Sequence, residues 1–216
     1  MLLVTLLAAV SVADAQWAAV LACPRVSVVG SSEGTGVVIG TKDGFAYLLT
    51  AAHVVSGADR VNVAFTSRER YPRAVWYPGD AEVVSRWPDP DLALVRFSID
   101  KRQVPVLPLA PAWQRPKAFP ADARSVGVEG NTDEPVRAEA VRAKEFITRD
   151  GKQPAFFWRT EVPPEPGRSG GPLLDARGRV IGIAVAASGG HGYYAHHDEI
   201  LAALKRDGHG WLVPEK

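Results

Sequence analysis

Three short segments of the chain carry side chains that could together perform nucleophilic catalysis. In chain order they read Thr50-Ala51-Ala52-His53, Asp91-Leu92-Ala93-Leu94 and Gly167-Arg168-Ser169-Gly170-Gly171-Pro172. A serine hydroxyl becomes a good nucleophile when a neighbouring imidazole takes its proton, and a buried carboxylate fixes the tautomer of that imidazole. We therefore interpret Ser169 as a candidate nucleophile, His53 as its general base and Asp91 as the residue that orients His53.

The glycines around Ser169 indicate a further component of such a site. A turn that points two backbone N–H groups at one spot needs conformations that a side chain obstructs, which favours glycine. We expect the N–H groups of Gly167 and Ser169 to form an oxyanion hole, and the chain to enter a strand at Leu173. Taken singly, each segment also has a structural explanation, namely a core histidine, an aspartate at a turn and a glycine-rich turn.

The elements that must position these residues are mostly strands. After Arg25 the chain consists of short β-branched runs separated by turn residues, which predict an all-β sandwich or barrel. The expected strands cover residues 26–29, 36–39, 45–49, 61–65, 81–84, 92–97, 104–109, 125–128, 136–146, 156–162 and 180–187. A proline-containing stretch at 110–121 is typical of a linker, and it divides the strands into an N-terminal half (25–110) and a C-terminal half (121–197).

One amphipathic helix is expected at the end of the chain, over residues 198–207. Ile200, Leu201 and Leu204 share one face of it, Asp198 is placed to cap its N-terminus, and Gly208 follows its end.

Three histidines, His191, His196 and His197, lie just before this helix. No cysteine or well-spaced carboxylate completes a recognisable metal-ligand pattern with them. We therefore expect a solvated loop at this position and no metal site.

The ordered set of motifs resembles the trypsin/chymotrypsin superfamily of serine proteases, and especially its bacterial, disulfide-free HtrA/DegP-like branch. In that family a Gly-x-Gly strand precedes Thr-Ala-x-His, as Gly34-Thr35-Gly36 precedes His53 here, and Asp-Leu-Ala-Leu and Gly-x-Ser-Gly-Gly-Pro-Leu follow. The resemblance covers nearly the whole chain after Arg25. It implies two antiparallel six-stranded β-barrels with the active site between them, His53 and Asp91 on the first and Ser169 on the second.

The family pattern also separates two neighbouring carboxylates. Asp89 and Asp91 lie two residues apart in Pro88-Asp89-Pro90-Asp91, and either could orient a histidine. We favour Asp91, because it directly precedes Leu-Ala-Leu-Val, as in the family.

The resemblance implies a serine endopeptidase that hydrolyses peptide bonds through an acyl-enzyme intermediate and needs no cofactor. Its partners would be protein or peptide substrates. Two alternatives remain open: a catalytically inactive binding protein that keeps the protease fold, and an esterase that uses the same triad. The chain ends at Lys216, shortly after the expected helix, so we expect a protease domain without a PDZ domain.

Two further features concern the activation and specificity of such an enzyme. Arg168 stands where digestive members of the superfamily have an aspartate that binds the new N-terminal ammonium, so we expect an enzyme that is competent once folded. The substrate pocket is expected to be lined by Val162, Pro163, Val185 and Ala186. Because small apolar residues dominate these segments, we expect cleavage after small or medium aliphatic residues.

Composition excludes several other classes of protein. The chain has 216 residues, of which 46% are hydrophobic and 23% charged, which is typical of a globular protein rather than a disordered or coiled-coil one. The formal net charge of +1 does not favour nucleic acid as a partner, and the single cysteine, Cys23, excludes an intrachain disulfide. No apolar run approaches the ~20 residues that a membrane-spanning helix needs.

The first 15 residues are expected to be a signal peptide. The apolar run from Leu2 to Val12 ends in the small-x-small pattern Ala13-Asp14-Ala15, which predicts cleavage after Ala15 and leaves 16–216 as the protease domain. We therefore expect a secreted or periplasmic protein, although no lysine or arginine precedes the run. A lipoprotein signal with Cys23 as the lipidated residue is a minor alternative. The sequence does not indicate an oligomeric state.

Overall fold

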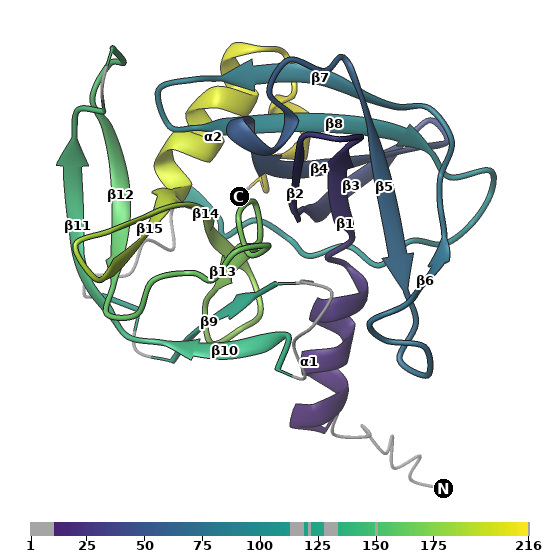
Figure 1. Cartoon of the computed structure of the whole chain (residues 1–216), viewed down its shortest axis with the longest axis horizontal. Helices are drawn as coiled ribbons and strands as arrows, with labels where there is room; N and C mark the ends of the chain where they lie inside the picture. Colours follow the sequence, from purple (N-terminus) through teal and green to yellow (C-terminus); the bar gives the residue numbers. More distant parts are fainter. Residues whose placement is uncertain (1–10, 113–118, 121, 128–133, 150, 216) are drawn as a thin grey trace, which may run out of the picture.

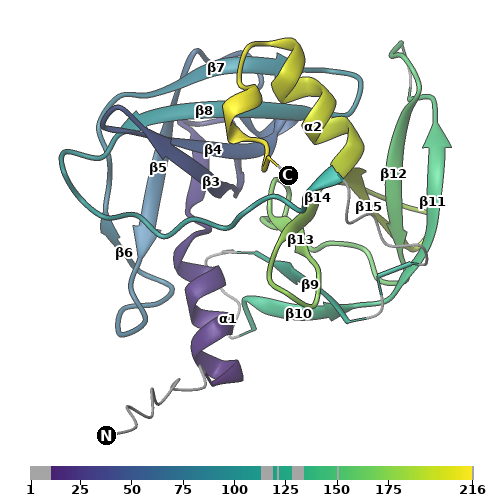
Figure 2. The ribbon, with the colours of Figure 1, turned by 180° about the vertical axis from the view of Figure 1, so that it is seen from behind.

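The chain folds into two curled antiparallel sheets that pack against each other, with a helix near each end (Figures 1 and 2). The computed structural model describes residues 11–112, 119–120, 122–127, 134–149 and 151–215. The predicted all-β fold with a C-terminal helix is confirmed, and the two predicted antiparallel barrels are two curled sheets, each a half-barrel. The two sheets contain eight and seven strands within the described residues, where six in each barrel were expected.

The first sheet has the order β2-β1-β5-β7-β8-β4-β3, with β6 paired to β5. Its strands are β1 (Arg25–Val28), β2 (Ser32–Thr35), β3 (Val37–Lys42), β4 (Phe45–Ala51), β5 (Arg60–Thr66), β6 (Ala74–Trp76), β7 (Ala81–Trp87) and β8 (Leu92–Ser98). The first four residues of β8, from Leu92 to Val95, are all buried, because β8 lies between β7 and β4 and both of its faces are covered.

The second sheet has the order β10-β9-β13-β14-β15-β12-β11. Its strands are β9 (Ala123–Val126), β10 (Val136–Glu139), β11 (Val141–Ile147), β12 (Ala155–Thr160), β13 (Pro172–Leu174), β14 (Val180–Ser188) and β15 (His191–His196). In the edge strand β11, buried or half-buried residues alternate with exposed ones, as expected for a strand with one face toward water. β11 and β12 form a hairpin whose turn stands beside the β7–β8 turn of the first sheet (Figures 1 and 2).

The C-terminal segment connects the two sheets. The helix α2 (His197–Arg206) follows β15, and the Trp87 indole of the first sheet donates a hydrogen bond to Asp207 at its end (Nε1···Oδ2 2.8 Å). The prediction that Asp198 caps α2 is wrong. The capping residue is His196, whose Nδ1 accepts the backbone N–H of Asp198 (3.0 Å), so the imidazole takes the acceptor role expected of a carboxylate.

The strand predicted at 104–109 is also wrong. This segment has no strand pairing beyond an isolated bridge between Leu109 and Val180, because Pro105 and Pro108 have no N–H to donate to a ladder. Most of the linker expected at 110–121 lies outside the described residues.

The N-terminal helix α1 (Val12–Leu21) precedes the first sheet. The expected cleavage point after Ala15 falls inside this helix, whereas most of the expected signal peptide lies outside the described residues. Val20 and Cys23 are buried in the core, and burial raises the pKa of the Cys23 thiol. Within the described part of the chain, every helix is too short or too polar to span a membrane.

Candidate active site

His53 and Asp91 meet at one end of the first sheet. His53 lies in the 3₁₀ helix η1 (Ala52–Val55), which directly follows β4, and Asp91 lies in the turn between β7 and β8. The Ala52 N–H donates to the Asp91 carbonyl (3.0 Å), so the two segments are joined by their backbones. Asp91 has a φ of 60°, a left-handed conformation that aspartate tolerates better than most residues.

Both oxygens of the Asp91 carboxylate accept hydrogen bonds from His53. Oδ1 accepts the backbone N–H of His53 (3.0 Å), and Oδ2 lies 2.8 Å from the imidazole Nδ1. Because an ionised carboxylate only accepts hydrogen bonds, Nδ1 carries the proton and Nε2 of the neutral ring is left as the base. The Asp91 side chain is 2% exposed and that of His53 is 45% exposed. The imidazole is therefore accessible to a ligand, whereas the Asp91 carboxylate is shielded from water.

A third group, Arg149, contacts the same carboxylate. Its guanidinium donates to Asp91 Oδ2 (NH1···Oδ2 3.0 Å) from the turn between β11 and β12. Burial alone would raise the pKa of the Asp91 carboxyl, but the hydrogen bonds and charges of His53 and then of Arg149 hold this pKa below its ordinary value. Asp91 is therefore ionised at neutral pH.

The predicted competitor Asp89 has a different contact. Its Oδ1 accepts the backbone N–H of Gln153 (2.9 Å), which belongs to the same β11–β12 turn as Arg149. The structure therefore places Asp91 against His53 and Asp89 against the second sheet.

Ser169 lies in a tight loop between β12 and β13. Gly167 and Gly170 have φ values of 93° and 85°, which strain any residue with a side chain. The loop is closed by hydrogen bonds from the Arg168 N–H to the Glu165 carbonyl (3.0 Å) and from the Gly171 N–H to the Arg168 carbonyl (2.9 Å). Within the described residues, neither the Gly167 nor the Ser169 N–H has an acceptor, so both are available to a substrate oxygen.

The first sheet holds this loop against the segment that carries His53. Thr35 donates its backbone N–H to the Ser169 carbonyl and its Oγ1 to the Gly167 carbonyl, both at 2.8 Å. Gly34 has no room for a side chain, because a Cβ there would lie 2.5 Å from the Ser169 carbonyl oxygen and 2.7 Å from Val54 Cγ2. Since Val54 follows His53 directly, the backbone of the Ser169 loop lies beside the segment that carries His53, and among the described residues the side-chain partner of His53 is Asp91 rather than Ser169.

Arg168, the residue before Ser169, is buried and belongs to a polar network under the loop. Its guanidinium donates to Ser125 Oγ (3.3 Å) and to the Glu134 carbonyl (2.7 Å), and Ser125 in turn donates to Glu139 Oε1 (2.6 Å). Arg137 pairs with the same carboxylate (2.8 Å). The partners of the Arg168 guanidinium therefore lie within the second half-barrel.

Other side chains shape this network. Gly127 leaves the space that Arg168 fills, because a Cβ at Gly127 would lie 2.4 Å from Arg168 Cγ. The Tyr194 hydroxyl lies 3.3 Å from Glu139 Oε1, and burial together with the Glu139 charge raises the pKa of this phenol.

The four residues expected to line a substrate pocket occupy different environments. Ala186 lines a cavity of about 230 Å³, whereas Val185 beside it is buried in the core. Val162 is 48% exposed, and the Pro163 carbonyl accepts a hydrogen bond from Arg137 (3.1 Å). The cavity is lined by Ile147, Arg149, Phe157, Ala186, Ser188 and Tyr193.

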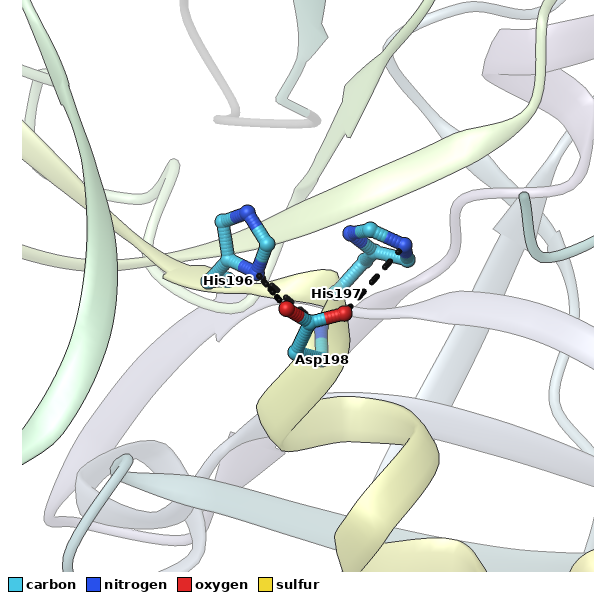
Figure 3. Close-up of side chains that lie close together, drawn as sticks. All are labelled: His196, His197 and Asp198. Atoms are coloured by element: carbon cyan, nitrogen blue, oxygen red, sulfur yellow. Dashed lines mark hydrogen bonds and ion pairs between the residues drawn. The ribbon is translucent and has the colours of Figure 1, made fainter. Parts of the chain in front are cut away.

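The solvated loop predicted around the histidines is wrong. His191 to His196 form β15, and both His196 and His197 are buried at the start of α2 (Figure 3). Asp198 Oδ2 lies 3.5 Å from His196 Nδ1 and 3.0 Å from Lys144 Nζ, and Asp198 Oδ1 lies 3.6 Å from His197 Nε2. The three side chains lie close enough together to hold a metal ion, but the Lys144 ammonium already neutralises the carboxylate.

Arg149 is the site residue that sequence reasoning missed. The sequence marks its segment as a turn, through Asp150-Gly151, but gives no sign that the turn reaches a carboxylate 58 residues earlier in the chain. Only the packing of the second sheet on the first brings the two side chains together.

Two packed antiparallel half-barrels, with a histidine–aspartate pair on one and a serine loop from the other, define the chymotrypsin-like class of fold. The family model described as the trypsin-like peptidase domain matches residues 34–183. The chain belongs to this family.

Relatives of known sequence and structure agree with this assignment. The chain is 34% identical over 155 residues to a Marinomonas protein named "Probable periplasmic serine endoprotease DegP-like", covering 71% of this chain and 29% of that protein. It is 33% identical over 170 residues to the serine protease Rv3671c of Mycobacterium tuberculosis, covering 72% of this chain and 36% of that protein. The chain thus spans about a third of the length of these curated relatives.

Solved structures share the fold over most of the chain. The inactive form of the Rv3671c protease superposes with a TM-score of 0.71 at 24% identity, covering 90% of this chain and 92% of that one. The HtrA-type protease AlgW with a tripeptide gives a TM-score of 0.67 at 27% identity, covering 92% of this chain and 64% of that one.

Proposed function

We propose that this protein is a serine endopeptidase in which Ser169 is the nucleophile, His53 the general base and Asp91 the residue that orients His53. The observation that carries the proposal is the pair of hydrogen bonds from His53 to Asp91, from Nδ1 to Oδ2 (2.8 Å) and from the backbone N–H to Oδ1 (3.0 Å). Beside this pair lies a serine loop with two available N–H groups. The bond from the His53 backbone N–H holds the Asp91 carboxylate, and the bond between Nδ1 and Oδ2 orients the imidazole and fixes its tautomer, which general-base catalysis requires.

The proposed reaction gives each of these residues one task. His53 Nε2 takes the hydroxyl proton as Ser169 Oγ attacks the substrate carbonyl carbon, and the Gly167 and Ser169 N–H groups bind the oxyanion. The tetrahedral intermediate collapses when the C–N bond breaks and His53 returns its proton to the leaving amine. Water, deprotonated by His53, then hydrolyses the acyl-enzyme and regenerates Ser169.

The proposal includes where the enzyme acts and what it cuts. Names of relatives that include "periplasmic" support a secreted or periplasmic location, and family membership supports peptide substrates. We keep the expectation of small or medium aliphatic residues before the cleaved bond. Glu161, the acidic residue near the expected pocket, pairs with Arg142 (2.6 Å), so its charge is already matched.

A fluorophosphonate probe tests the activated serine without knowledge of the substrate. We expect one adduct, mapped by mass spectrometry to Ser169, that is absent in Ser169→Ala and in His53→Ala. Ser31→Ala, which removes an exposed hydroxyl from the β1–β2 turn, is the control and should be labelled like the unmodified protein. Folded protein that shows no labelling would contradict the proposal and favour the inactive binding protein.

A further inference from the structure

The turn of the β11–β12 hairpin, in the second sheet, contacts Asp91 of the first sheet. Two hydrogen bonds join this turn to the β7–β8 turn: Arg149 NH1 to Asp91 Oδ2 (3.0 Å), and the Gln153 backbone N–H to Asp89 Oδ1 (2.9 Å). Both views of the ribbon place the two turns side by side (Figures 1 and 2). The two ends of the Asp89–Asp91 segment are therefore held from the other half-barrel.

Arg149 binds the same carboxylate oxygen as the imidazole. Oδ2 of Asp91 accepts from both His53 Nδ1 (2.8 Å) and Arg149 NH1 (3.0 Å), whereas Oδ1 accepts the His53 backbone N–H. Two donors on one oxygen fix the plane of the carboxylate more firmly than the imidazole alone. The guanidinium also affects the charge of the His53–Asp91 pair. A nearby cation stabilises the state in which Asp91 is ionised and His53 is neutral, so that the pair carries a net negative charge.

We propose that Arg149 is a positioning residue for the triad: it fixes the Asp91 carboxylate from the second half-barrel and sets the pH range in which the His53–Asp91 pair acts as a base. The inference rests on the proposed function of Ser169, His53 and Asp91. It assigns to the β11–β12 turn the role of completing the His53–Asp91 site from the opposite half-barrel.

The surroundings of Asp91 make Arg149 the group to test. Among the described residues, the charged groups that act on the Asp91 carboxylate are His53, from η1, and Arg149, from the β11–β12 turn. The nearby Asp89 is engaged by the Gln153 N–H. The Arg149 side chain is 29% exposed, so water and salt weaken the ion pair but do not replace it.

The test compares pH profiles of kcat/KM for a peptide substrate in the unmodified protein, Arg149→Gln and Arg149→Lys. Arg149→Gln removes the cation that stabilises the ionised Asp91 carboxylate, so the acidic limb of the profile should move to higher pH. Arg149→Lys keeps the charge but loses the planar guanidinium, so its limb should stay in place while kcat falls. A residue with a merely structural role would lower kcat without moving the limb.

A second readout does not depend on activity. In Ser169→Ala protein, the carboxyl ¹³C shift of Asp91 followed against pH should show a higher pKa when Arg149→Gln is added. Arg179→Gln is the matched control, because Arg179 pairs with Asp175 (2.6 Å) in the same half-barrel but in the β13–β14 turn, and it should leave the Asp91 pKa unchanged.

The outcomes separate this inference from the proposed function. An unmoved limb and an unmoved Asp91 pKa in folded Arg149→Gln protein would overturn the role of Arg149, even if Ser169 is labelled by the probe. Absence of labelling at Ser169 would overturn the proposed function, while the ¹³C titration would still measure the coupling of Arg149 to Asp91.

Discussion

Two arginines secure the two halves of the site, and they do so in opposite ways. Arg168 is 3% exposed and bonds to Ser125 and to the Glu134 carbonyl, all within the second half-barrel. Arg149 is 29% exposed and crosses to the first half-barrel to bind Asp91 directly. The Ser169 loop is thus fixed by a buried network, and the Asp91 carboxylate that binds His53 by a partly solvated ion pair.

The difference shows what each arginine can control. A buried cation away from the reacting atoms sets geometry and stability, because removing it leaves buried polar groups without their donor. A cation that shares an oxygen with the catalytic imidazole sets charge as well as geometry. Changes at Arg168 should therefore appear in stability, and changes at Arg149 in pH dependence.

The largest effect is expected where the two half-barrels meet, at Asp91. Asp91→Asn keeps the shape but lets the amide stabilise the wrong imidazole tautomer, so kcat/KM should fall by about 10⁴-fold. Adding Arg149→Gln should then cost little more, because the carboxylate through which Arg149 acts is already gone. Steady-state kinetics of the single and double variants check this, and additive losses would show that Arg149 acts independently of Asp91.

The next largest effect is expected from Arg168→Met, which keeps an unbranched side chain but removes the buried charge. We expect a loss of about 3 kcal/mol in the free energy of unfolding, measured in urea, because Ser125 and the Glu134 carbonyl lose a donor in the interior. The remaining folded protein should react more slowly with a fluorophosphonate, while the acidic limb of its pH profile stays in place.

Arg124→Met is the matched control for this prediction. Arg124 precedes Ser125 on β9 but is half-buried, so its replacement should change stability by no more than roughly 0.5 kcal/mol. Equal stability of the two variants would contradict the assignment of Arg168 to a buried structural network, and so would a shifted limb in Arg168→Met.

Local chemistry explains which parts of the fold the sequence could predict. Alternating or continuous apolar runs define most strands, as in β8, because burial selects their residues. The strand β15 was missed because its His-Gly-Tyr-Tyr-Ala-His sequence resembles a polar loop, and only pairing with β12 and β14 makes it a strand. The cap of α2 was misplaced because a histidine seldom takes the role that His196 takes here.

The same distinction holds for the site. His53, Asp91 and Ser169 stand in motifs whose local backbone needs particular residues, such as the positive φ of Gly167 and Gly170. Arg149 stands in an ordinary hairpin turn, and the burial of Arg168 depends on the empty space at Gly127. Contacts of this kind depend on how one sheet packs on another, which no local pattern specifies.

The smallest expected effect is on the free energy of unfolding of Arg149→Gln. It tests directly whether Arg149, unlike Arg168, acts through its charge. The folded pKa of Asp91 lies below its unfolded value of about 3.9, so the associated stability is present above that value and is lost as the pH falls through the folded pKa. Arg149 contributes part of this lowering, and its pair is partly solvated. We therefore expect Arg149→Gln to cost at most about 1 kcal/mol at neutral pH, and less near pH 3. Urea unfolding at both pH values measures the difference, and an equal cost at both would show that Arg149 acts through packing rather than charge.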